Sequence, residues 1–358
     1  KPLFIDFGVL FATAVVSFLI NTKPAGFADS VFKFRWIPAV LFTGYVISFD
    51  FKKYMQLFCK ASYVMIPIVG AVCVYQFFTG INPMPSSQII YKNGDFFRAV
   101  GMAGPLTSSY SMALFFVFFV TLFFASKANL KEKMFQVASV LGAFVVPFAT
   151  ISRGPILSMV AGCFLTLLLF NYKIALAITV VMLIAPTALI LTNDLFAKKF
   201  HDLVTMKDIS VTWREKVLRV NWEMFKDHPI FGVGFGNSEH HLREYYDRMG
   251  WFDFNFMKAT ANNYLEFLSG LGILGFSSYV FVCLFFMKVS FDFYRQEVDS
   301  ELKSYSLALL GVQVCFHASG FMEGIFFSAY PRHFMIMVWA MVLGLLLHKK
   351  RLSSASKP

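Results

Sequence analysis

Long runs of apolar side chains separated by short polar segments dominate this sequence. Several of the runs join into stretches of about 18 residues or more, enough for an α-helix to cross the hydrocarbon core of a bilayer. Helices are expected because lipid cannot satisfy the hydrogen-bonding groups of an exposed backbone. We predict ten spans, at residues 3–20, 36–49, 54–78, 106–124, 134–150, 155–170, 174–191, 263–287, 303–319 and 333–347. The number is a lower bound, because a sequence that begins with Lys1 rather than Met can lack upstream spans.

The basic residues of the short loops orient these spans, because Lys and Arg are retained on the cytoplasmic side. They gather in alternate connections, at 52–53, 127–133, 173, 288–295 and 349–351. The external segments are then 21–35, 79–105, 150–154, 192–262 and 320–332. Only 192–262 is large, and its own basic residues do not oppose this assignment, because long loops translocate largely regardless of charge. We expect an all-α, polytopic protein, a single membrane domain over 1–358 with 192–262 as an inserted helical periplasmic loop.

Composition supports the membrane class. The 358 residues are 57% hydrophobic and only 15% charged, whereas a soluble domain carries about a quarter charged residues. A water-soluble protein is therefore excluded. The net charge of +11 is spread over the loops, which argues against nucleic acid and favours membrane lipids and phosphate groups as partners. The five cysteines lie in apolar stretches and form no CxxC pair, as is typical of small structural residues.

The external loop contains a segment in which charged and aromatic residues alternate with apolar ones, at 211–225. Its apolar positions fit helical spacing loosely, which predicts an amphipathic helix that lies on the membrane domain. Arg214 and Arg219 on such a helix project towards polar groups. A contact with solvent or lipid headgroups and a contact with a phosphate ligand both agree with this pattern.

A second arginine, Arg153, stands in the short external junction 150–155 between two spans. It can anchor to headgroups, but a guanidinium also binds phosphate through two parallel hydrogen bonds and keeps its charge. Arg153 and Arg214 on one external face suit the pyrophosphate of a lipid. We predict that the two side chains converge on one cavity at the outer membrane surface.

The segment 228–237 contains three glycines in a GxGxG pattern. It is no nucleotide-binding signal, because it follows no buried strand and opens no βαβ unit. The glycines instead predict an irregular turn that lets the backbone approach a ligand or a neighbouring helix. The pair His240-His241 follows without a second ligand cluster at zinc spacing, so we expect no metal site here.

Three elements in order resemble the O-antigen ligase and O-antigen polymerase superfamily. They are Ser152-Arg153-Gly154, the Arg…His-Pro-hydrophobic-x-Gly-x-Gly element from Arg214 to Gly236, and the run from Asn262 to Leu268 followed by a glycine-rich stretch to Gly275. The resemblance covers about residues 140–285. It implies a GT-C-like, metal-independent glycosyltransferase of the bacterial inner membrane whose active site faces the periplasm. The donor would be a glycan on undecaprenyl pyrophosphate, and no cofactor is implied.

The resemblance also implies roles for individual residues. Arg153 and Arg214 would bind the pyrophosphate, where their charge offsets the charge that develops on the leaving oxygen. The family's motif histidine, the expected general base, corresponds to Ala261, which cannot accept a proton. Engineered replacement and natural divergence both remain open for this position. The other expected substrate-binding residues are Arg219, His241, Asn262, Tyr264 and Glu266, of which His241 and Glu266 are the next candidates for the base.

The two activities of the superfamily differ in the acceptor. A ligase transfers the glycan to the lipid A core, and a polymerase to a second lipid-linked glycan. We favour the ligase, because the arginine spacing and the single compact external loop fit it better. A lipid or glycan transporter is a further alternative, but the spans contain few ionisable residues, whereas ion-coupled carriers place acidic groups near the midplane.

Overall fold

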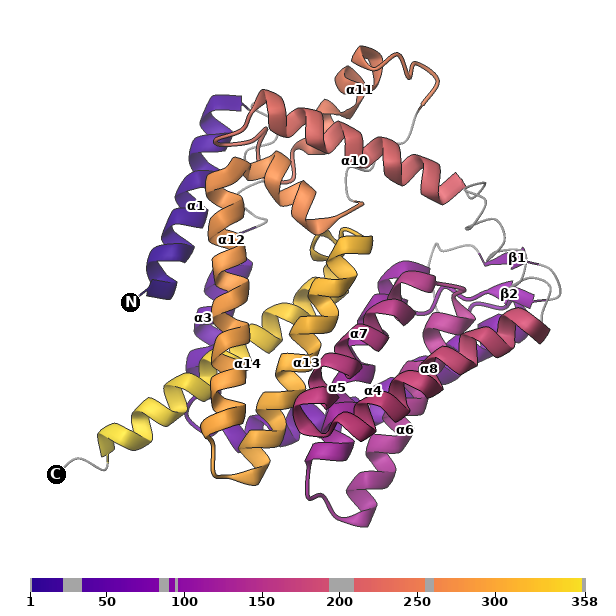
Figure 1. Cartoon of the computed structure of the whole chain (residues 1–358), viewed down its shortest axis with the longest axis vertical. Helices are drawn as coiled ribbons and strands as arrows, with labels where there is room; N and C mark the ends of the chain where they lie inside the picture. The colour runs from indigo at the N-terminus through magenta and orange to yellow at the C-terminus, as the bar shows by residue number, and fades with distance from the viewer. Residues whose placement is uncertain are drawn as a thin grey trace. The chain divides into compact units, whose positions relative to one another are not determined.

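The computed structural model describes residues 2–21, 34–83, 90–93, 96–192, 209–254 and 261–355. Helices dominate it, as predicted, and the described residues add one short antiparallel hairpin, β1 (Tyr91–Asn93) with β2 (Phe96–Arg98). The helices are α1 (Pro2–Asn21), α3 (Trp36–Ile47), α4 (Phe51–Thr79), α5 (Pro105–Ala125), α6 (Leu130–Ala149), α7 (Arg153–Phe170), α8 (Tyr172–Thr192), α10 (Ile209–Asp227), α11 (Ser238–Arg248), α12 (Asn263–Gln296), α13 (Ser300–Met322) and α14 (Ala329–Ala355), with a 3-10 turn, η2, at Ile325–Phe327 (Figure 1).

Each of the ten predicted spans overlaps one of these helices; eight lie within their helix, whereas 36–49 and 134–150 extend past the ends of α3 and α6 at Ile47 and Ala149. Among the described residues, seven helices are long and apolar enough to cross a membrane: α4, α5, α6, α7, α12, α13 and α14. In α1, α3 and α8 the apolar part is shorter, at Ile5–Ser17, Trp36–Ile47 and Tyr172–Ile184. The protein is thus a multi-pass helical membrane protein with seven candidate spans, while a total of ten and the external side of the loops stay predictions.

The chain forms two compact units. Unit 1 comprises Lys1–Ala39, Lys198–Phe286 and Gly320–Phe327, and unit 2 comprises the remainder. The described part of the large loop is helical, with α10 and α11 in unit 1, whereas residues 193–208 and 255–260 of the loop lie outside the described residues. The expectation of a single membrane domain stays a prediction.

Unit 2 is built around α5, most of whose residues are buried. Helices α4 and α6 meet at two glycines, since a Cβ on Gly70 would lie 2.6 Å from the carbonyl oxygen of Gly142. Small residues at such a contact let helix backbones approach closely, which is the usual way that membrane helices pack without a hydrophobic driving force. Lys52 pairs with Asp299 at 2.6 Å, which ties the start of α4 to the connection between α12 and α13.

In unit 1, the long helix α12 is broken where Gly272 takes a non-helical conformation with φ 63° and ψ −170°. The glycine-rich segment supplies backbone partners at the break: Val233 N–H donates to Ser269 O at 2.8 Å, and Gly234 N–H to Gly270 O at 2.9 Å. In return, Ile273 N–H donates to Pro229 O at 2.8 Å. A break in an apolar helix is tolerated where protein groups satisfy the freed backbone, and this segment does so.

This contact confirms that the glycines of 228–237 let the backbone approach a neighbouring helix, which is α12. Gly232 has φ 70°, and a Cβ there would lie 2.4 Å from the carbonyl carbon of Gly270. The hydroxyl of Ser17 on α1 lies within hydrogen-bonding distance of both carbonyl oxygens, 3.3 Å from Gly232 O and 3.2 Å from Gly270 O. Three distant segments therefore meet through backbone atoms, and only glycine fits between them.

We expect Gly232→Ala to destabilise the protein by more than about 3 kcal/mol, because the added methyl group adds overpacking to an unfavourable φ. Gly250→Ala is the matched control, since Gly250 has φ 73° but nothing within 4 Å of its Cβ. This control should cost only about 1 kcal/mol. Melting temperatures of the two variants in detergent measure the difference, and equal losses would mean that the close approach to α12 contributes nothing.

Candidate functional site

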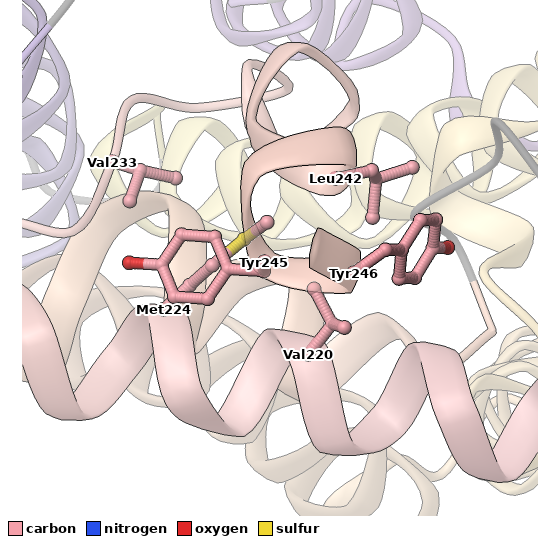
Figure 2. Packing of buried hydrophobic residues seen from close by; sticks show 6 residues of the cluster. All are labelled: Val220, Met224, Val233, Leu242, Tyr245 and Tyr246. Carbon is pink, nitrogen blue, oxygen red and sulfur yellow. The ribbon is translucent and has the colours of Figure 1, made fainter. Parts of the chain in front are cut away.

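Helices α10 and α11 pack on each other through a small apolar cluster (Figure 2). The α10 side chains Val220 and Met224 are fully buried against residues of α11, with Val233 at the edge of the cluster; the α11 members are Leu242, Tyr245 and Tyr246. Val217, Val220 and Met224 follow helical spacing on one face, which confirms that 211–225 forms an amphipathic helix. The opposite face of α10 carries Arg219, whose side chain is 64% exposed and pairs with Glu215 at 2.6 Å.

Arg214 lies in the first half of α10 and is held by two contacts. Its Nη2 donates to Oε2 of Glu323 at 2.9 Å, and its guanidinium lies over the ring of Trp213, 5.5 Å from the centroid. Its Nε is buried and has no hydrogen-bond partner among the described residues. A buried donor without a partner costs about 1–3 kcal/mol, so Arg214 is a fixed cation that still has an unused donor.

Asn262 caps the start of α12. Its Oδ1 accepts from the backbone N–H of Tyr264 at 2.8 Å and of Leu265 at 3.1 Å, while Nδ2 donates to Phe321 O at 3.0 Å. The capping oxygen satisfies helix N–H groups that have no partner within the helix. The side chain that we expected to bind substrate is therefore already engaged in the local structure, and its role towards substrate stays a prediction.

The next residues of the motif attach α12 to the segment 320–327. Asn263 Oδ1 accepts from Phe326 N–H at 2.9 Å, and its amide packs against Gly320. The ring of Tyr264 lies 4.4 Å from that of Phe321, centroid to centroid. The same short segment carries Glu323, the partner of Arg214, so the motif and the arginine belong to one assembly of contacts within unit 1.

Ala261 stands immediately before the capping residue and is only 3% exposed. The position that corresponds to the motif histidine is thus an internal one, next to the first turn of α12. Its methyl side chain cannot hold or move a proton. Any general base in this chain must come from another residue.

The two remaining candidate bases, Glu266 and His241, contact the side chains of two adjacent residues, Ser238 and Asn237. The carboxylate of Glu266 is 1% exposed and accepts at Oε1 from the hydroxyl of Ser238 at 3.0 Å. His241 Nε2 lies 3.2 Å from Nδ2 of Asn237, which also donates to Val233 O at 3.0 Å. An amide NH₂ can only donate, so Nε2 accepts and the proton of a neutral imidazole sits on Nδ1.

Arg153 opens α7 in unit 2, after a strained junction in which Ile151 has φ 53°. Positive φ is unfavourable for a β-branched residue and marks a position held by its surroundings. Nearby, Arg98 on β2 donates through Nε to Thr150 O at 3.0 Å. A second arginine therefore lies at the junction that carries Arg153.

Arg98 and Glu323 lie outside the motifs that predicted the site residues. Their positions in the sequence place them only in the predicted external segments 79–105 and 320–332. Arg214 and the other predicted residues lie in unit 1, whereas Arg153 lies in unit 2. The convergence of Arg153 and Arg214 on one cavity stays a prediction. Among the described residues, no group of three or more His, Cys, Asp and Glu side chains is placed to hold a metal ion.

Asp227, the last residue of α10, accepts hydrogen bonds from Tyr245 and Arg248 of α11. Desolvation favours a raised pKa for Asp227, but hydrogen bonds from Arg248 and Tyr245 outweigh it and hold the pKa below its usual value. A lowered folded-state pKa gives stability that is present above the unfolded pKa of about 4 and is lost as pH falls through the folded value.

We therefore expect Asp227→Asn to lower the melting temperature at pH 7 and to weaken its dependence on pH between about 5 and 2. The exposed Asp253, which makes no ion pair among the described residues, provides Asp253→Asn as the control. Thermal scans followed by tryptophan fluorescence at several pH values test this. If the melting temperature of Asp227→Asn falls with decreasing pH as steeply as that of the parent, the Asp227 carboxylate does not contribute to stability.

Two comparisons identify similar proteins. Residues 137–280 match the family model described as O-antigen ligase. The Teichuronic acid biosynthesis protein TuaE of Bacillus subtilis (strain 168) is 24% identical over 224 residues, which cover 58% of this chain and 44% of TuaE. The match thus spans less than half the length of that relative. The resemblance drawn from the motifs is confirmed over 137–280, the segment that carries Arg153, Arg214 and Asn262, and this segment is similar to the O-antigen ligase family.

Proposed function

We propose that this protein transfers a glycan from undecaprenyl pyrophosphate to the lipid A core on the periplasmic face of the inner membrane. The observation that carries the proposal is Arg214, a cation held by Glu323 and Trp213 whose side chain is 31% exposed and therefore within reach of a ligand. Such a fixed donor suits a pyrophosphate oxygen, because it needs no reorganisation as negative charge develops during the reaction. The family match over 137–280 supports the same class of chemistry.

In the proposed reaction, a hydroxyl oxygen of the acceptor attacks the anomeric carbon of the donor. The bond from that carbon to the pyrophosphate oxygen breaks, and the leaving group takes the electron pair. Arg214 stabilises the charge on the leaving pyrophosphate, and the hydroxyl proton passes to a general base. Ala261 offers no acceptor in this chain, so Glu266 and His241 are the candidates for the base if the parent transfers glycan as fast as Ala261→His.

A polymerase that joins lipid-linked repeat units is the second candidate. The match to a protein named for teichuronic acid biosynthesis favours it, because that name refers to the making of a polysaccharide. Both candidates use the same donor chemistry and the same arginines. They differ only in the hydroxyl that attacks.

The product decides between the two. The protein, reconstituted in proteoliposomes with its lipid-linked glycan and purified lipid A core together, should yield glycan joined to lipid A core. Longer lipid-linked glycans with no lipid A product would establish the polymerase instead. If Ala261→His in the same assay forms neither product, the transferase proposal is wrong.

A further inference from the structure

An open hollow of about 670 Å³ lies on unit 1, on the outer side of α10. It is lined by Leu218, Arg219, Trp222, Glu223, Met249 and Trp251. The first four recur along one side of α10, opposite the face that carries the buried Val217, Val220 and Met224. Its volume falls within the range of about 300–1,000 Å³ that is usual for ligand sites.

The two indole rings of the hollow come from different elements. Trp222 projects from α10 and is 47% exposed. Trp251 follows α11 and is positioned by a Schellman turn, in which Trp251 N–H donates to Tyr246 O at 2.8 Å and Gly250 N–H donates to Asp247 O at 3.0 Å. Gly250 takes φ 73° there, as the turn requires.

Further contacts hold Trp251 in place. Its ring lies 6.4 Å from that of Tyr246, centroid to centroid, and the ammonium of Lys216 lies 5.1 Å from its ring centroid. The turn, the neighbouring ring and the cation restrict the indole before any ligand arrives. Ordering a side chain costs about 0.5–1.5 kcal/mol on binding, and this part of the cost is avoided here.

The charges that line the hollow are balanced. Arg219 pairs with Glu215 at 2.6 Å, and Glu223 pairs with Lys226 at 2.6 Å, all on α10. These two pairs cancel, and among these residues the remaining charge is that of Lys216, whose ammonium faces the ring of Trp251. The indole faces and the paired charges suit a neutral, hydroxyl-rich ligand. The guanidinium and carboxylate still have free hydrogen-bonding capacity, since one pair uses only part of their donors and acceptors.

We propose that this hollow binds the sugar chain of the donor or acceptor, as an oligosaccharide subsite separate from the pyrophosphate site. A sugar ring has an apolar C–H face and a rim of hydroxyls. The C–H face stacks on the electron-rich face of an indole, and the hydroxyls bond to Arg219 and Glu223. The proposal rests on the proposed function, because it assigns a place to the glycan of that reaction.

The test uses the purified full chain and free oligosaccharides that carry no lipid and no pyrophosphate. An array of bacterial surface-polysaccharide fragments selects the probe, and its affinity is then measured by calorimetry. Trp222→Ala and Trp251→Ala should each weaken binding at least about tenfold, which corresponds to about 1.4 kcal/mol. Phe252→Ala is the matched control, because Phe252 is 63% exposed and adjacent to Trp251 but outside the hollow.

Arg214→Ala should leave this affinity unchanged, because the free sugar has no pyrophosphate. Sugar binding with no transfer product even in Ala261→His would overturn the proposed function and leave the subsite standing. The subsite proposal is wrong if the parent chain binds no oligosaccharide, or if both tryptophan variants bind it with the same affinity as the parent. The tryptophan variants could instead keep the sugar affinity of the parent and lose melting temperature in lipid nanodiscs but not in detergent. That result would show that the indoles anchor in a membrane interface.

Discussion

Arg214→Ala is expected to weaken the binding of undecaprenyl pyrophosphate by about 10- to 100-fold, because hydrogen bonds to charged groups contribute about 1.5–3 kcal/mol. The lost groups are the unused buried Nε donor and a charge that cannot be removed by deprotonation. Binding of the radiolabelled lipid in nanodiscs measures the change. This assay needs no catalytic base, so the alanine at position 261 does not affect it.

Glu323→Gln tests whether Arg214 binds the ligand or only forms a structural ion pair with Glu323. The carboxylate lies 2.9 Å from Arg214 and competes with the pyrophosphate for the guanidinium. Its removal should maintain or increase the affinity for pyrophosphate, whereas Arg214→Ala decreases it. If both variants lower the melting temperature and neither changes pyrophosphate binding, the pair is structural and the donor site lies elsewhere. Lys226→Ala serves as the control from the same helix, because its side chain is 50% exposed.

Most of the helices could be predicted because their signal is local. Apolar runs of sufficient length define a span without reference to the rest of the chain, and the buried face of α10 follows from the spacing of Val217, Val220 and Met224 alone. The glycines of 228–237 could likewise be assigned to a close backbone approach. Their partner could not, because nothing near Gly232 in the sequence points to Gly270.

The break in α12 shows this limit most clearly. Residues 263–287 have the composition of an uninterrupted span, and Gly272 alone does not predict a break, since glycine is common in membrane helices. The break exists because Val233, Gly234 and Pro229 supply hydrogen-bond partners from a segment about 40 residues earlier. Tertiary contacts of this kind override a local pattern.

The candidate site could likewise be predicted only in part from the sequence. The motifs pointed to Arg214 and Asn262, but only the structure pairs Arg214 with Glu323, which lies 109 positions further along the chain. Asn262 matched a motif expected to bind substrate, whereas its side chain caps α12. A short polar residue before an apolar helix is also a capping signal, so the sequence supported both interpretations.

Ala261→His is expected to raise the rate of glycan transfer by about 10²- to 10⁴-fold, the usual contribution of a general base. Position 261 directly precedes the cap of α12, in the unit that holds Arg214. Imidazole accepts a proton only in its neutral form, so the gain should appear as pH rises through the pKa of this group. Transfer is measured in proteoliposomes over pH 5–8, with lipid-linked donor and lipid A core.

Two comparisons show whether the gain comes from the base itself. Ala261→Leu adds bulk at the same 3%-exposed position without a proton acceptor, so it should not gain activity. Binding of undecaprenyl pyrophosphate should be the same in the parent and in Ala261→His, because the arginines are unchanged. If the parent already transfers glycan as fast as Ala261→His, position 261 does not supply the base. Glu266→Gln and His241→Gln in the parent then identify which of the two groups accepts the proton, since only substitution of the true base should abolish activity while donor binding is kept.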